Sequence, residues 1–340
     1  MKTHPLCLAV GVLMCTPALA LAQDAPVVDE TLRDRAAQGS ETPEGWNIKL
    51  KLGASFSLVD SRSWVGSTEG STFQIGGIAE TNANYKRGPW EWDNTLAIQH
   101  QQTRTPQFDR FIKSTDNLDL ISFLFYSFPD IDWVGAYLRL SLNTQVLDGD
   151  YVADGNVTLN RNGDLETLGL GESSRLTSSF EPLLLRQTVG VFANPIEDKE
   201  ITVKIRAGLG AQETLTRDGF VVQDDEGTPE IDLVQLSSLN QLGAEADLSA
   251  TGAIQEGVLS WQAGANVFVP FVSDNSDIDN DPNIELRAGL SAKLSSWLSL
   301  DYLFQGRRVP QVLDEWQVQN SLLLTAGFDL VSPKAPEGDS

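Results

Sequence analysis

Cysteine and histidine are almost absent from this chain. Of its 340 residues only 2 are Cys, at positions 7 and 15, and 2 are His, His4 and His100. Both cysteines fall in an N-terminal segment for which we predict removal, so disulfides are not expected to hold the mature protein together. The lack of Cys and His clusters also argues against a zinc or redox-metal site.

Basic residues are scarce, and so are long apolar runs. The sequence has 24 Lys and Arg against 47 Asp and Glu, a formal net charge of −23. A surface of that sign repels phosphates, which argues against a nucleic-acid partner. Beyond the N-terminus no segment approaches the roughly 18 apolar residues that a membrane-spanning helix needs, so the pattern excludes a helical membrane protein.

The N-terminus has the features of a signal peptide. Lys2 provides a basic start, residues 6–21 are apolar, and Ala20-Leu21-Ala22 fits a small-x-small cleavage site. We therefore predict a signal peptide at 1–22 and Sec-type export. Residues 23–45 are polar and are interpreted as a periplasmic leader, with a plug or partner-docking segment as the alternative.

A period of two runs through the rest of the chain. From Trp46 to Leu58, apolar and polar or small residues alternate for thirteen positions, the pattern of a strand with two different faces. The same pattern recurs in eleven further segments, most of them long enough for a tilted strand that crosses a membrane. They are residues 72–86, 90–101, 116–128, 133–146, 182–193, 200–213, 241–254, 258–272, 284–295, 297–305 and 316–330.

The two faces of these segments differ in charge. Across the middle of every strand, the apolar frame contains no Asp, Glu, Lys or Arg, as expected for a lipid-facing band. The other frame is polar and nearly balanced in sign, as expected for a lumen. Its basic members are Lys49, Lys51, Arg139, Arg186, Lys204, Arg206, Arg287 and Lys293, and its acidic members are Glu80, Glu91, Asp93, Asp119, Glu245, Asp247, Glu285, Asp301 and Asp329.

Connection lengths and aromatic positions fix the orientation. Short links alternate with long ones, and two of the long links, 217–235 and 273–283, are strongly acidic. The pattern predicts an all-β fold, a transmembrane antiparallel barrel of about twelve strands over 46–330, in the outer membrane of a Gram-negative bacterium. Both termini, including a tail at 331–340, would lie in the periplasm. An aromatic girdle is expected near the turn end, formed by Trp46, Tyr85, Trp90, Trp92, Tyr126 and Trp261.

Two stretches of the chain resemble a known family. One is Trp90-Glu-Trp92-Asp-Asn94-Thr-Leu96; the other begins Lys113-Ser-Thr-Asp116-Asn-Leu-Asp119 and continues from Trp133 to Gln145. Over about residues 46–155 the chain resembles a family of Gram-negative outer-membrane barrels catalogued only as a domain of unknown function. The resemblance implies a barrel in the outer membrane and assigns no substrate. Its motif residues here are Trp92, Asn94, Lys113 and Asp116, of which the last two form either a polar cluster or an interstrand salt bridge.

Signals for catalysis and metal binding are weak. His100 lies at the loop-side end of a strand, on the lipid-facing frame and without a Gly-x-Ser-x-Gly elbow, so we predict no enzyme. The loop 273–283 offers several carboxylates, Asp274, Asp277, Asp279 and Asp281, which suit calcium but lack the spacing of an EF-hand. A solvated acidic loop is the alternative, and no other cofactor is expected.

The leading functional hypothesis is a narrow channel for diffusion of a small polar solute. Its predicted lining is Lys49, Lys51, Glu80, Glu91, Asp93, Arg139, Arg186, Lys204, Arg206, Glu245 and Asp247. We expect residues 147–181 to fold into the lumen and constrict it. The alternatives are a closed structural or assembly barrel and, more remotely, a lipid-modifying enzyme. Expected partners are outer-membrane lipid, lipopolysaccharide and the barrel-assembly machinery.

Overall fold

The computed structural model describes residues 44–61, 70–106, 108, 110–198, 200–222, 229–254, 258–274, 281–295, 297–309 and 313–331. This part of the chain forms strands and connections, and it contains no helix long and apolar enough to cross a membrane. The predicted signal peptide at 1–22, almost all of the leader at 23–45, and the tail after Val331 lie outside the described residues.

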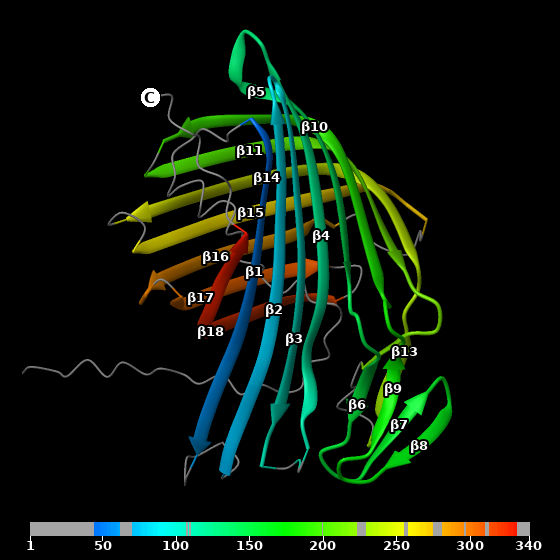
Figure 1. Ribbon diagram of the computed structural model, residues 1–340. Coiled ribbons are helices and arrows are strands. Elements are labelled where there is room, and N and C mark those ends of the chain that lie inside the picture. Colours follow the sequence, from blue (N-terminus) through cyan, green and yellow to red (C-terminus); the bar gives the residue numbers. More distant parts are fainter. Residues whose placement is uncertain are drawn as a thin grey trace, which may run out of the picture.

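Twelve strands close into one antiparallel barrel (Figure 1). In the order of their pairing, they are β1 (Gly45–Ser61), β2 (Gly70–Arg87), β3 (Trp90–Arg104), β4 (Ile112–Phe128), β5 (Ile131–Thr144), β10 (Leu183–Glu197), β11 (Ile201–Leu215), β14 (Leu239–Ile254), β15 (Leu259–Ser273), β16 (Asn283–Lys293), β17 (Leu298–Val309) and β18 (Leu313–Val331). Pairing of β1 with β18, for example Gly53 opposite Gly327, closes the ring. The all-β barrel prediction is confirmed.

Each strand contains the greater part of one predicted segment, and most extend beyond it. One extension is at the start of β4, which begins at Ile112 instead of 116. A shift in the pairing of β3 with β4 at Gln101 and Gln102 explains it, because Thr115 and Lys113 pair with these residues and Ser114 is left over. This extra residue interrupts the alternation on which the sequence prediction depended.

The outer wall is apolar and exposed. Val189, Leu209 and Leu138 are 61%, 60% and 51% exposed. Their immediate neighbours in the sequence, Thr188, Gly210 and Arg139, lie on the inner face of the barrel. Soluble monomers rarely expose apolar surface on this scale, whereas a lipid-facing wall must do so. The outward frame also contains acidic residues near the loop ends of strands, among them Asp116 and Glu213.

The aromatic girdle forms at the turn end. The Trp46 ring lies 5.1 Å from that of Tyr85 and 5.9 Å from that of Trp92, and Trp90 lies 4.8 Å from Tyr126. The indole of Trp261 covers Gly252 near the same end. Such rings suit the interface between hydrocarbon and water, since they combine an apolar body with a polar edge.

Two long loops build a small lobe beyond the loop end of the barrel (Figure 1). The loop between β5 and β10 contains β6 (Gly149–Val152), β7 (Val157–Arg161), β8 (Asp164–Leu168) and β9 (Ser173–Thr177), and the loop between β11 and β14 contains β12 (Phe220–Val222) and β13 (Ile231–Gln235). One sheet has the order β12-β13-β7-β8 and the other pairs β6 with β9. We call this unit the external lobe.

The external lobe has its own apolar core, and the predicted folding of 147–181 into the lumen is wrong. Leu159 and Leu168 are buried against Phe220 and Leu233 from the other loop. Leu165 and Leu170, which were expected to pack inside the barrel, are instead 65% and 61% exposed. Apolar side chains are more stable when they are buried against each other between the two loops than when they are placed in a lumen lined by charged groups.

Candidate functional site: the charged belt of the lumen

Glycines clear part of the inner wall on β10 and β11. Gly190 pairs with Gly208 in register, and a Cβ on either residue would collide with the backbone of the other strand. Gly210 follows on the same face, and a Cβ there would come within 3.6 Å of the Glu245 carboxylate. This glycine floor lets side chains from β5 and β14 reach over the two intervening strands.

Arg139 and Glu245 meet above the glycine floor. Their strands, β5 and β14, are separated by β10 and β11, yet the Arg139 Nη1 donates to Glu245 Oε1 at 2.8 Å. Glu245 also accepts from Thr188 Oγ1 at 2.5 Å and from Asn266 Nδ2 at 2.7 Å, and Arg186 Nη1 lies 3.6 Å from Oε1. The Glu245 side chain is 2% exposed, and these three hydrogen bonds, together with the nearby Arg186 guanidinium, compensate for its loss of water.

Arg206 and Asp247 form the second ion pair. They are direct cross-strand neighbours on β11 and β14, and Arg206 Nε and Nη2 donate to Asp247 Oδ1 at 2.9 and 2.5 Å. The Arg206 guanidinium also lies 4.7 Å from the ring centroid of Phe123, and that of Arg139 lies 5.6 Å from it. We call Arg139, Arg186, Arg206, Glu245 and Asp247 the lumen belt.

An aromatic shelf on β4 borders the belt. Phe123 and Phe125 stack with ring centroids 5.3 Å apart, and Phe125 contacts Phe192 edge-on at 5.1 Å. These rings depart from the otherwise polar inward frame. Their partners are Tyr137 and Phe192 of the next two strands, together with Arg139 and Arg206 of the belt.

A second cluster of polar side chains lines the inner wall formed by β2 and β3. Asn82 donates to Glu80 at 2.7 Å, and Asn84 donates to Glu91 at 3.0 Å and also to Asp93. Glu80 is 3% exposed. On this wall side-chain amides donate to the carboxylates.

The structure thus brings together five of the predicted lumen residues as the belt and three as the amide-bound wall. Lys204 lies on the inward face of β11, two residues before Arg206. Lys49 and Lys51 belong to β1, with Lys51 opposite Glu80 in register, but their side chains lie outside what the structure describes. Thr188 and Asn266, which donate to Glu245, were not predicted from the sequence, although both lie on the polar frame of their strands.

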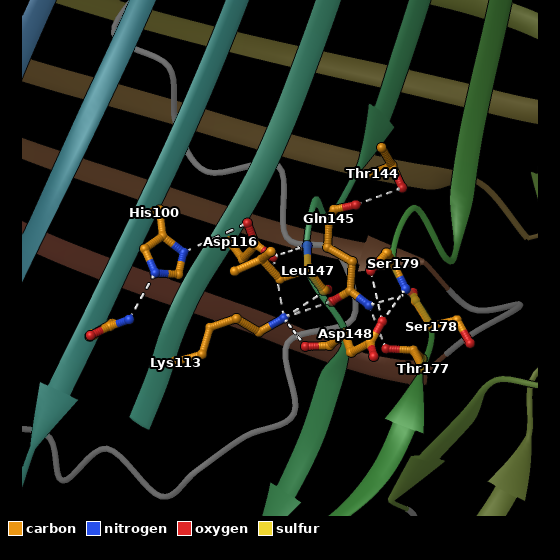
Figure 2. A network of polar contacts seen from close by, with 11 residues as sticks. His100, Lys113, Asp116, Thr144, Gln145, Leu147, Asp148, Thr177, Ser178 and Ser179 are labelled. Atoms are coloured by element: carbon orange, nitrogen blue, oxygen red, sulfur yellow. Dashed lines mark hydrogen bonds and ion pairs between the residues drawn. The ribbon is translucent and has the colours of Figure 1, made fainter. Parts of the chain in front are cut away.

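The family-motif residues Lys113 and Asp116 anchor the external lobe to the barrel (Figure 2). Lys113 Nζ lies 3.3 Å from Asp116 Oδ2 and donates to the carbonyls of Leu147 and Asp148 at 3.0 and 2.5 Å. Asp116 accepts from the Leu147 amide at 2.6 Å. Both residues lie on β4, so their ion pair is not interstrand, and both bind the chain as it leaves β5.

The anchor extends to the return of the same loop. Gln145 Nε2 donates to Thr177 Oγ1 at 2.5 Å, and the amide and hydroxyl of Ser179 both donate to Asp148 Oδ1 at 2.7 Å (Figure 2). The Ser179 hydrogen bonds hold the pKa of the Asp148 carboxyl below its usual range. The start and the end of the lobe are thereby tied together beside the barrel rim.

His100 has a neighbour that the sequence did not reveal. Its Nδ1 lies 3.8 Å from Asp116 Oδ1, and its Nε2 lies 3.2 Å from the Gln102 amide nitrogen. The imidazole and the carboxylate lie opposite each other in the pairing of β3 with β4. Within the described residues no serine or threonine hydroxyl is hydrogen-bonded to this imidazole, so the arrangement lacks a nucleophile next to the base.

The other two motif residues, Trp92 and Asn94, lie on the outer wall. The Trp92 indole donates to Ser122 Oγ at 2.9 Å, and the Ser122 hydroxyl donates to Asn94 Oδ1 at 2.8 Å. Asn94 in turn donates to the carbonyl of Ala83 at 3.3 Å. This chain of hydrogen bonds joins β2, β3 and β4 next to the aromatic girdle, where polar groups on a lipid-facing wall need partners.

The predicted calcium loop is only partly described, since Asp277 and Asp279 lie outside the described residues. Asp274 accepts from the backbone and side chain of Asn240, which hold the pKa of its carboxyl below the usual range. Asp281 is 3.3 Å from Arg308. Among the residues described, no group of three or more His, Cys, Asp or Glu is placed to hold a metal ion.

Comparison with known proteins agrees with the family resemblance. Residues 56–149 match the family described as Protein of unknown function (DUF3078). The predicted resemblance is confirmed over this segment. Because the match spans less than half of the chain, it establishes similarity and not membership. No curated protein sequence matches the chain.

Solved structures with a similar course of the chain are bacterial membrane barrels. An outer membrane channel from Pseudomonas putida F1 is 12% identical, with a TM-score of 0.39 over 85% of this chain and 97% of that one. The translocator domain of the autotransporter NalP from Neisseria meningitidis is 9% identical, with a TM-score of 0.38 over 88% and 93%. At these values nothing about function is carried over.

Proposed function

We propose that the protein is an outer-membrane barrel that forms a narrow channel for small polar solutes. The observation that carries this proposal is the course of the lumen belt. Its ion pairs lie along the wall formed by four consecutive strands, β5, β10, β11 and β14, over the glycine floor. A belt placed along one wall constricts a twelve-stranded lumen from one side without spanning it.

The membrane assignment rests on the outer wall and on the connections. A closed antiparallel barrel with an even number of strands, an apolar exterior, short turns at one end and long loops at the other is typical of outer-membrane proteins. Sec-type export and insertion by the barrel-assembly machinery belong to the same proposal, as does contact of the external lobe with lipopolysaccharide.

A closed structural barrel is the second candidate, and the burial of lumen carboxylates favours it. Glu80, Glu245 and Asp301 are 3%, 3% and 5% exposed. Carboxylates this deeply covered take part in a packed interior, which in a barrel of intermediate width can fill the lumen.

Single-channel recording on refolded full-length protein tests the two candidates. The channel predicts discrete conductance steps that become larger when Arg186, at the edge of the belt, is replaced by Ala. His100→Ala serves as the matched control, since we propose no enzymatic role, and it should leave conductance unchanged. Silence of the wild type across a range of salt concentrations contradicts the channel and leaves the structural barrel.

A further inference from the structure

The lumen belt contains more positive than negative charge. Three guanidinium groups, those of Arg139, Arg186 and Arg206, face two carboxylates. Glu245 is shared by Arg139 and Arg186, while Asp247 is bound by Arg206. The neighbouring Arg287 and Glu285 pair at 2.5 Å and add one charge of each sign, so the excess of one positive charge remains.

One donor of the belt has no partner. Arg139 Nε is buried and makes no hydrogen bond, although the same guanidinium binds Glu245 through Nη1. A buried N–H without an acceptor costs about 1 to 3 kcal/mol, so the hydrogen-bonding capacity of the belt arginines is not fully used by the protein. Arg186 and Arg206 also keep 20% and 17% of their side-chain surfaces exposed, so their remaining N–H groups can be approached.

The surroundings of these donors are aromatic. Phe123 lies beneath the guanidinium groups of Arg139 and Arg206, and Phe125 stacks on Phe123. The next strand after these rings is β3, where Glu91 and Asp93 pair in register with Phe125 and Phe123. Asn84 donates to both of those carboxylates, and the rings stand between them and the arginines.

We infer that the lumen belt is a subsite for small carboxylates with a flat apolar body. The ligand carboxylate supplies the missing negative charge and accepts from the exposed N–H groups of Arg186 and Arg206, and its body packs against the border of the aromatic shelf that Phe123 and Phe125 form. A planar carboxylate matches the guanidinium fork. This inference rests on the proposed channel, since it names the solutes that such a channel would favour.

Benzoate is the probe, and benzyl alcohol and inorganic phosphate are the comparison solutes. In planar bilayers under a KCl gradient, the wild type should prefer chloride over potassium, and benzoate should reduce the open-channel current.

Arg186→Gln keeps the Arg139 pair with Glu245 and should weaken the block by benzoate about tenfold, the equivalent of one charge-assisted hydrogen bond. Phe123→Leu should weaken it without changing ion preference. Arg175→Gln, in the exposed part of the external lobe, should change neither.

Failure of the carboxylate subsite and failure of the channel give different results in these experiments. A conducting channel without chloride preference, or one that benzyl alcohol or phosphate blocks as strongly as benzoate, overturns the carboxylate subsite and leaves the channel intact. A silent barrel contradicts the channel. Calorimetric titration of benzoate into the detergent-solubilised full chain then decides the subsite alone: binding that Arg186→Gln weakens supports it, and absence of binding overturns it.

Discussion

At the scale of single residues, the structure depends on how charges are satisfied inside the barrel. Glu245 accepts hydrogen bonds from Arg139 on β5, Thr188 on β10 and Asn266 on β15, and Arg186 on β10 lies 3.6 Å from it. A buried ion pair of this kind contributes little net stability compared with an apolar pair, but losing one partner leaves an uncompensated charge. Glu245 therefore supplies the negative charge that allows Arg139 and Arg186 to be buried in the barrel interior.

Glu245→Gln should lower the free energy of unfolding by about 3 kcal/mol, because two arginines lose the carboxylate that they share. Combining it with Arg139→Met should recover part of the loss, since one of the two stranded charges is gone. Urea unfolding in lipid vesicles, followed by tryptophan fluorescence, measures both variants. Asp164→Asn, on an exposed strand of the external lobe, is the control. A Glu245→Gln midpoint equal to the control value would contradict this account.

At the scale of elements, the barrel strands were predictable and the external lobe was not. An alternation of thirteen residues is a strong signal for a strand, and each of the twelve segments that carry this pattern is a barrel strand. The lobe strands are only 3 to 5 residues long, too short for a period of two to stand out. The belt was predicted as a set of lumen residues, but the pairing of Arg139 with Glu245 depends on glycines of the two strands that lie between them.

Leu159→Ala should loosen the external lobe and leave the barrel intact. Leu159 is fully buried in the lobe core, and truncating such a residue costs about 2 to 5 kcal/mol. Limited proteolysis should then cut within residues 147–181 far faster than in the wild type, while the boiled and unboiled gel mobilities keep their difference. Leu165→Ala, at a position that is 65% exposed, is the matched control. Equal cleavage of the two variants would count against a separately packed lobe.

At the scale of the whole molecule, closure by β1 and β18 decides whether the chain can remain in a membrane. Each open edge would leave a row of N–H and C=O groups without partners in hydrocarbon. Deleting residues 313–331 should therefore abolish heat-modifiable gel migration, whereas the complete chain should show it together with a β-type circular dichroism spectrum. A truncated chain that still migrates as a compact species in vesicles would show that β1 can pair elsewhere.

The parallel pairing of β7 with β13 has a consequence for the order of assembly. Leu159 lies opposite Ile231, so a single sheet is built from two loops that lie about seventy residues apart in the chain. Neither loop can complete this sheet until both have crossed to the same side of the membrane, which requires β5, β10, β11 and β14 to be in place. Formation of the lobe is therefore a late event, and a folded lobe marks a molecule whose central strands are already inserted.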